Sequence, residues 1–175
     1  MKAMKMNVTL WPLLMLGLIL YVAEPPEVPS WMSVDHEAKT VTMDIVAGKT
    51  DAYNHWNFNG YAKGEATVVV PVGYTVTINF KNDDPVMVHS LGIGPLEDTF
   101  PAMFTDVKPA FEGAMSSNPT DMTNATKPGA SETLTFTADK AGDYAMICLI
   151  PGHAMAGMWI KFSVSADGQA GLIAP

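Results

Sequence analysis

One short stretch near the C-terminus gathers three side chains that bind soft metal ions. In "YAMICLIPGHAMAGMWIKF", residues 144–162, Cys148 is followed five positions later by His153 and after five more by Met158. Cys148 is the only cysteine in the chain, so its thiol is either buried and inert or chemically used. The stretch has the pattern of a strand, the turn "PGHAMAG" and a returning strand, which would direct the three side chains into one loop. A thiolate, an imidazole and a thioether brought together suit a soft metal ion.

A metal site of this kind needs a further imidazole from another part of the chain. Two histidines, one cysteine and a distant methionine form the ligand set of copper sites that pass single electrons. His89, in "PVMVHSLGI", lies late in a β-like run and is well placed to be the second histidine. His36 lies in the polar "SVDHEAK" and is expected in solvent, whereas His55 is expected to be structural or at the surface. Met155 competes with Met158 for the methionine position.

The elements that must position these residues are short β-strands. From about residue 40 onward, β-branched runs alternate with turn signals such as "NDDP" and "ADKAGD", and we find no 3.6-residue period long enough for a major helix. In "TVTINF" the apolar Val76, Ile78 and Phe80 share one face of a strand. The pattern predicts an all-β sandwich or barrel. The predicted strands are residues 40–47, 55–60, 65–71, 74–82, 86–93, 131–138, 142–150 and 157–165.

A long proline-containing and methionine-containing segment, residues 94–130, interrupts this rhythm before the last strands. Its length far exceeds a normal connection between strands. We expect it to be an insertion that lies over one end or one face of the sandwich, with room for a turn or two of helix.

The first 25 residues have the pattern of an export segment. Two lysines precede the uncharged run "VTLWPLLMLGLILYVA", which is followed by the proline-rich "EPPEVPS". No clean cleavage site follows, so we expect an uncleaved membrane anchor at residues 1–25, a linker at 26–39 and one domain at 40–175. The alternative is a cleaved signal peptide. The lysines before the run place the domain outside the cell membrane in either case.

The composition narrows the classes of partner. The chain has 175 residues, with 18 acidic against 10 basic side chains and a formal net charge of -8. Nucleic-acid phosphates require a basic protein face, so no nucleic-acid partner is expected. We also expect the protein to be a monomer. The charged fraction of 16% is low, which limits the charge repulsion that unfolds proteins in acid and suits an acidic setting.

The spacing Cys-x4-His-x4-Met, with an upstream histidine followed by a small polar residue, resembles that of the cupredoxins. Within that group, "CLIPGHAMAGMW" and "NFNG" resemble the sulfocyanin family, and "HS" at residues 89 and 90 is similar to the rusticyanins. The resemblance implies a Greek-key β-sandwich that binds one copper ion, Cu(I) or Cu(II). It implies His89, Cys148 and His153 as strong ligands and Met158 as the weak axial ligand, because Met158 opens the return strand.

The resemblance also implies a function, namely electron transport by an electron carrier that is not an enzyme. The expected partners are respiratory-chain components such as a cytochrome complex or a terminal oxidase, in an acidophile, in an iron-oxidising or oxygen-reducing pathway. We expect Ser90 to donate a hydrogen bond to the thiolate, and His153 to present a ring edge at the surface beside Met155. A copper chaperone or copper-storage protein is the alternative. A copper enzyme would need more histidines than the four present, and a dinuclear copper domain would need a second cysteine.

Overall fold

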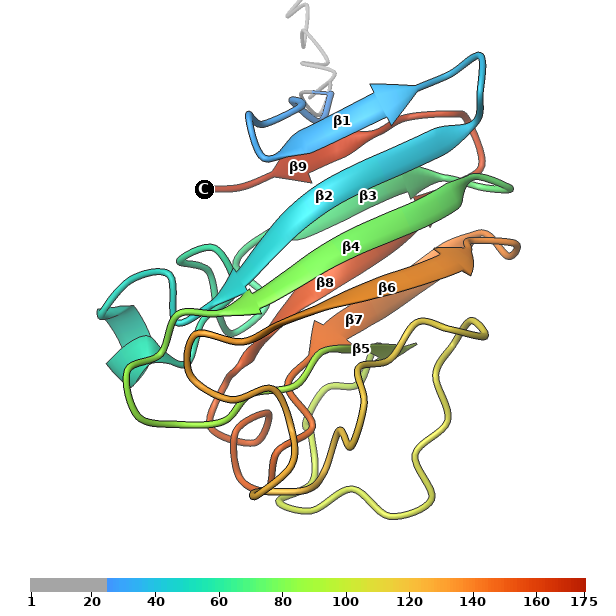
Figure 1. Cartoon of the computed structure of the whole chain (residues 1–175). Coiled ribbons are helices and arrows are strands. Elements are labelled where there is room, and N and C mark those ends of the chain that lie inside the picture. The colour runs from blue at the N-terminus through green and yellow to red at the C-terminus, as the bar shows by residue number, and fades with distance from the viewer. Residues whose placement is uncertain (1–24) are drawn as a thin grey trace, which may run out of the picture.

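Two β-sheets pack face to face and enclose the core (Figure 1). The computed structural model describes residues 25–175, and among these no helix is long and apolar enough to cross a membrane. The first sheet has the order β1-β2-β4-β6 and the second the order β5-β7-β8-β3-β9. The elements are β1 Met32–Asp35, β2 Thr40–Ala47, the short 3-10 helix η1 Ala52–His55, β3 Thr67–Pro71, β4 Thr75–Asn82, β5 Gly92–Pro95, β6 Ser131–Thr137, β7 Gly142–Ile147, β8 Trp159–Ser165 and β9 Gly171–Ile173.

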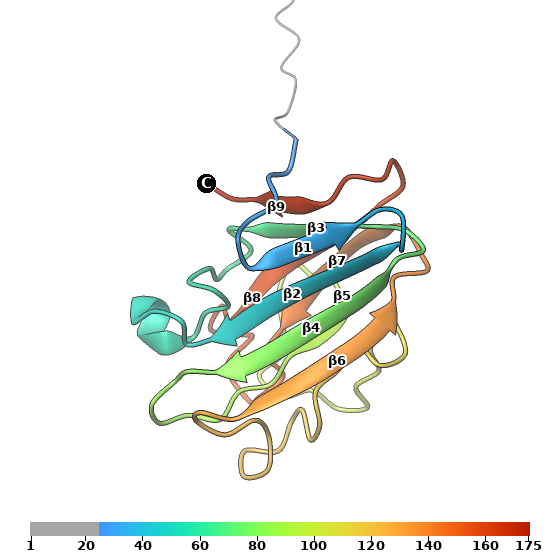
Figure 2. The same ribbon diagram turned by 45° about the horizontal axis from the view of Figure 1, so that its top comes forward.

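The core lies between the two sheets, which Figure 2 shows as two layers. Along β4 the burial alternates as the sequence predicted, with Val76, Ile78 and Phe80 fully buried. The Phe80 ring meets the Phe58 ring edge to face at 6.3 Å. Alternate side chains of a strand point to opposite faces, so each strand gives one face to this apolar layer. The prediction of an all-β sandwich is confirmed.

Most predicted strands are present, and each sheet has one further strand at an edge, β1 in the first sheet and β9 in the second. The predicted strands that correspond to β2, β3, β4, β6, β7 and β8 are residues 40–47, 65–71, 74–82, 131–138, 142–150 and 157–165. β1 lies within residues 26–39, which we expected to be a linker, and it pairs antiparallel with β2. β9 pairs antiparallel with β3. The membrane anchor expected at residues 1–25 lies almost wholly outside the described residues.

The prediction of a strand at residues 55–60 is wrong. The chain there forms the end of η1 and a tight loop, because Tyr53, Asn54 and His55 all have left-handed backbone angles, with φ of 55°, 56° and 63°. The buried side chain of Asn57 stabilises the loop, since its Nδ2 donates to the carbonyls of residues 50 and 52, each at 2.9 Å. Side-chain bonds of this kind compete with a strand ladder for the backbone groups.

The prediction of a strand at residues 86–93 is wrong over most of its length. Oδ1 of Asp84 accepts hydrogen bonds from the N–H groups of Val86 (2.8 Å) and Met87 (2.9 Å), which turns the chain after β4. His89 then pairs with the chain only through an isolated bridge, and β5 begins three residues later. The second histidine of the predicted metal site therefore lies in a connection and not in a strand.

The insertion expected at residues 94–130 covers one edge of the sandwich and contains no helix. Phe111 stacks on Phe136 of β6 with ring centroids 5.5 Å apart, and it lies 4.9 Å from the ring of Tyr144 on β7. The insertion therefore joins the two sheets along the side where β6 ends the first sheet and β5, next to β7, ends the second. Phe100 packs into a second apolar cluster on the outer face of β7.

Candidate metal centre

Two connections at one end of the sandwich bring the predicted metal ligands together. Cys148 directly follows β7, Met158 directly precedes β8, and His153 lies in the turn between them. The amide of Cys148 donates to the carbonyl of Met158 (3.1 Å), and the amide of Met158 donates to the carbonyl of His153 (2.9 Å). His89 comes from the connection between β4 and β5, where its amide donates to the carbonyl of Thr126 in the insertion (3.0 Å). The pairing of β7 with β8 and the insertion thus hold the site from two sides.

The donor atoms of the two histidines and the cysteine converge on one point. The Nδ1 atoms of His89 and His153 lie 3.2 Å apart, and Sγ of Cys148 lies 3.7 Å from the first and 3.5 Å from the second. A point at equal distance from all three corners is about 2.0 Å from each, close to the bond lengths known for zinc, about 2.0–2.1 Å to nitrogen and about 2.3 Å to sulfur. The cluster therefore fits a single metal ion, and thiolate with imidazole suits copper better than a hard cation.

The thiol of Cys148 keeps its proton near neutral pH unless a metal ion binds and displaces that proton. Burial raises its pKa to about 11, and hydrogen bonds from the amides of Ser90 and Ile150 oppose this only in part. The Ser90 amide lies 3.5 Å from Sγ and its hydroxyl oxygen 3.8 Å. That hydroxyl accepts a hydrogen bond from the Leu149 amide (2.9 Å), which leaves its own proton to point at sulfur. Ser90 thus lies where the sequence predicted a donor to the thiolate.

A buried carboxylate that we did not predict orients His89. Nε2 of His89 donates to Oδ2 of Asp84 at 2.9 Å, and only 3% of Asp84 is exposed. Burial alone would raise the pKa of Asp84, but hydrogen bonds from the amides of Met87 and Val86 and from His89 hold that pKa below its usual range. With the proton on Nε2, Nδ1 of His89 carries its lone pair towards Cys148. A carboxylate that fixes the tautomer of a ligating histidine in this way is common at metal sites.

His153 is buried, which corrects the expectation that one edge of its ring lies at the surface. Only 1% of His153 is exposed, because the indole of Trp56 stacks on its ring with centroids 4.1 Å apart and planes inclined by 20°. Burial, with a smaller contribution from the nearby His89, lowers the pKa of His153 to about 4. Burial also lowers the pKa of His89, although Asp84 opposes that effect. Both imidazoles are therefore neutral and able to bind metal near neutral pH.

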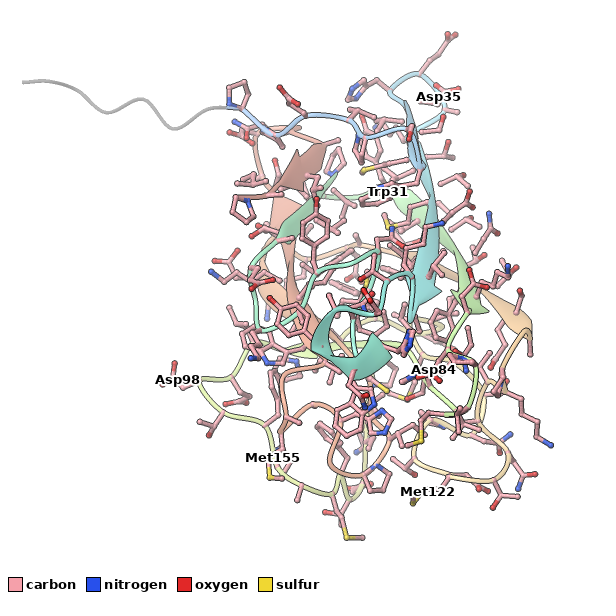
Figure 3. All side chains as sticks on the ribbon, turned by 90° about the vertical axis from the view of Figure 1, so that its left-hand side faces the viewer. Trp31, Asp35, Asp84, Asp98, Met122 and Met155 are labelled. Carbon is pink, nitrogen blue, oxygen red and sulfur yellow. The ribbon has the colours of Figure 1, made fainter. Side chains whose placement is uncertain are left out.

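The two candidate methionines lie in different environments. Met158 is fully buried in the same core cluster as Cys148, whereas 60% of Met155 is exposed. Figure 3 shows Met155 at the end of the molecule opposite to Trp31. The expectation that Met155 lines the surface is confirmed, and the backbone hydrogen bonds of Met158 place it next to both Cys148 and His153.

The other two histidines are not part of the cluster. His36 is exposed, as predicted, and its Nδ1 lies 2.9 Å from the hydroxyl of Tyr74. His55 is partly exposed and lies beside Trp56. Asp84 could have been found as the carboxylate of the turn "NDDP" that precedes His89. Trp56 had no comparable signal, because it lies almost a hundred residues before the ring it covers.

Comparison with known proteins identifies the family. A family model described as the Sulfocyanin (SoxE) domain matches residues 29–171. Sulfocyanin of Sulfolobus acidocaldarius is 33% identical over 141 residues, covering 75% of this chain and 67% of that protein. Rusticyanin of Acidithiobacillus ferrooxidans is 30% identical over 133 residues, covering 75% of this chain and 81% of that protein.

Among solved structures, one of the copper protein rusticyanin has a TM-score of 0.49 at 26% identity, covering 77% of this chain and 87% of that chain. A reduced auracyanin from Roseiflexus castenholzii has a TM-score of 0.46 at 29% identity, covering 71% of this chain and 96% of that chain. Sulfocyanin and rusticyanin are blue copper cupredoxins, which are electron carriers and not enzymes. Since the family model spans nearly all the described residues and the buried donor cluster fits copper, this chain belongs to the sulfocyanin family, with a type 1 copper ion as its cofactor.

Proposed function

We propose that this protein carries single electrons between components of a respiratory chain on the outer face of a cell membrane. In this proposal His89, Cys148 and His153 are the strong copper ligands and Met158 is the weak axial ligand. The observation that carries the proposal is the burial of the site: His89, Cys148 and Met158 are fully buried and 1% of His153 is exposed. A substrate that had to bind the metal would find no access, whereas an electron needs none.

Side chains around the proposed ligands orient their donor atoms for copper and exclude water. When bound, copper supplies a one-electron couple between its cuprous and cupric states. Asp84 holds the His89 ring in the tautomer that leaves Nδ1 free for the metal, and Ser90 directs its hydroxyl and amide at the thiolate. Cys148 lies in the buried apolar cluster that also contains Met146 and Ile150, and this packing excludes water from its thiol. Holding the donor atoms within a rigid, packed end of the sandwich limits the rearrangement that accompanies electron transfer.

Charge and sequence pattern support the cellular setting. The apolar run after the N-terminal lysines suits a single-pass anchor that would keep the domain near membrane partners. The low charged fraction and the lowered pKa of His153 suit acidic surroundings, because protons compete with copper for imidazole nitrogen. A cytochrome complex or a terminal oxidase is the partner we propose, in an iron-oxidising or oxygen-reducing pathway.

The first experiment tests whether the cluster binds copper as a carrier does. The copper-loaded, oxidised protein should show an intense visible band from thiolate-to-copper charge transfer, and Cys148→Ser should lack it. The band should disappear on addition of one electron equivalent and return on reoxidation. A colourless wild-type protein would contradict the proposal.

The second experiment tests the membrane partner. Oxidised protein is mixed with respiratory membranes of the source organism, a respiratory substrate is added, and the loss of the visible band is timed. Met155→Glu should slow this reduction with no change in the spectrum, because Met155 is exposed at the copper end. Ile173→Glu is the matched control, since Ile173 is 48% exposed on β9. If membranes reduce all three proteins only at the rate of spontaneous reduction, the respiratory assignment is wrong.

A copper chaperone or storage protein remains the competing function, and metal exchange separates it from a carrier. A chaperone gives up cuprous ion quickly to a soluble chelator, whereas a carrier with a buried site holds it. The burial of all the cluster residues favours slow exchange. Rapid, complete transfer of copper to the chelator at neutral pH would favour the chaperone.

A further inference from the structure

Trp56 forms a wall of the metal cluster that the sequence did not predict. Its indole lies almost parallel to the imidazole of His153, with centroids 4.1 Å apart. On another side, the His89 ring meets the His153 ring edge to face at 5.0 Å. The Nδ1 edge of His153 faces Sγ of Cys148 at 3.5 Å. The imidazole is thus held between an aromatic face and the other donor groups.

The backbone that precedes Trp56 has an unusual conformation. Three successive residues before Trp56, at positions 53–55, have left-handed backbone angles. Such angles are costly for residues other than glycine and persist only where the surroundings enforce them. The Trp56 amide donates to the carbonyl of Tyr53 (3.0 Å). The Asn57 side chain stabilises the same loop by donating to the carbonyls of residues 50 and 52. Figure 3 shows this segment, with η1, on the face turned to the viewer.

The indole acts through its flat face and not through its polar atom. Nε1 of Trp56 is buried and has no hydrogen-bond partner among the described residues. A buried N–H without a partner destabilises a fold, so hydrogen bonding does not explain a tryptophan here. Trp56 itself is partly exposed, so the indole separates His153 from solvent.

We propose that Trp56 is a positioning residue of the copper centre, which holds the His153 ring with Nδ1 directed at the metal and closes it from solvent. The inference rests on the copper site proposed above but not on its membrane partner. Without the indole, the ring could turn about its side-chain bonds and direct Nδ1 outwards. No bond forms or breaks on Trp56, and the electron passes between copper and the redox partner as before.

The first test uses the metal-free protein, so its outcome does not depend on copper. Diethyl pyrocarbonate modifies accessible imidazoles, and peptide mass mapping separates His153 from the other histidines. Wild type and Trp56→Phe should protect His153, whereas Trp56→Leu, which keeps an apolar side chain but no flat face, should let it react several times faster. Trp31→Leu is the matched control, a partly buried tryptophan at the far end of the molecule. Equal protection in Trp56→Leu and wild type would overturn the proposal.

The second test reads the copper centre itself. Trp56→Leu should bind copper roughly tenfold more weakly, as expected when a group that supports a metal ligand is lost, and its electron paramagnetic resonance spectrum should change. Trp56→Phe should restore both properties, and Trp31→Leu should leave them unchanged. Unchanged affinity and spectrum in Trp56→Leu would overturn the positioning role.

A measurement on the wild-type protein covers the case in which Trp56→Leu does not fold. Ring protons that lie over an indole face have nuclear magnetic resonance signals shifted upfield. The His153 ring protons of the metal-free wild type should show this shift, and their ordinary position would refute the stack. Failure of the copper function would appear separately, as a wild-type protein without a charge-transfer band but with a protected His153.

Discussion

Replacing Asp84 by asparagine should weaken copper binding with little effect on the metal-free fold. Oδ1 of Asp84 accepts the amides of Val86 and Met87, so an asparagine would keep its carbonyl oxygen there and present its NH₂ group to His89. In the metal-free protein His89 can change tautomer and accept from that NH₂ group with Nε2. A metal on Nδ1 forces the proton onto Nε2, so two donors would face each other in a buried site.

The magnitude follows from that unsatisfied contact. The hydrogen bond from His89 to Asp84 is 2.9 Å long, and 0% of the His89 side chain and 3% of the Asp84 side chain are exposed, so water cannot replace the lost acceptor. A buried donor left without a partner costs about 1–3 kcal/mol, more when the lost acceptor was charged. Because the cost falls on the metal-bound state, we expect copper affinity to fall by about 2 kcal/mol, or roughly 30-fold, within the range of about 10–100-fold for groups that support metal ligands.

Competition with a chelator of known affinity measures the effect for cupric and cuprous ion. Asp83→Asn is the matched control, because it removes the same charge from the neighbouring residue, whose carboxylate pairs with Lys81 near the surface (2.7 Å). Its affinity should stay within about twofold of wild type, since exposed ion pairs contribute little. Equal affinities of Asp84→Asn and Asp83→Asn would refute the reasoning, because charge alone would then explain the effect.

Two further predictions concern stability. The metal-free protein should lose stability as pH falls from 6.5 towards 4. The pKa of His153 is lowered to about 4 in the folded state, so only the unfolded state takes up a proton at this histidine in that window. The resulting loss in the free energy of unfolding is about 3 kcal/mol. Urea unfolding at several pH values measures it, and a slope equal to that of His153→Gln would contradict the assignment. Phe111→Ala should cost about 3–5 kcal/mol, because Phe111 is buried where the insertion joins the sheets. Urea unfolding should show a smaller loss for the partly exposed Phe104→Ala, and equal losses would mean that the insertion does not hold the sheets together.

The strands could be predicted where one residue's burial follows from its neighbours. Val76, Ile78 and Phe80 alternate with polar residues, and they are buried as that alternation requires. Cys148, His153 and Met158 are close in sequence, so a strand, a turn and a strand suffice to bring them together. Their convergence with His89 could be predicted only from the ligand set and the family resemblance.

The parts that could not be predicted depend on contacts between distant segments. Trp56 covers His153 because left-handed residues turn the chain back at a site where composition favoured a strand. β1 is stabilised by its pairing with β2, which overrides the proline-rich, linker-like character of the sequence around it. Neither contact leaves a local period in the sequence, so neither could be found from patterns of hydrophobic residues.

The wrong strand at residues 86–93 and the support of the metal centre have the same physical cause. Asp84 stays ionised while buried because the amides of Val86 and Met87 donate hydrogen bonds to it. Those two amides therefore cannot donate to a neighbouring strand. The same carboxylate orients His89 through its second oxygen. A regular strand would satisfy the backbone without Asp84 and would leave His89 with no fixed tautomer. The irregular backbone is therefore the means by which this chain builds a histidine ligand, and local propensity fails here because the side chain serves the site.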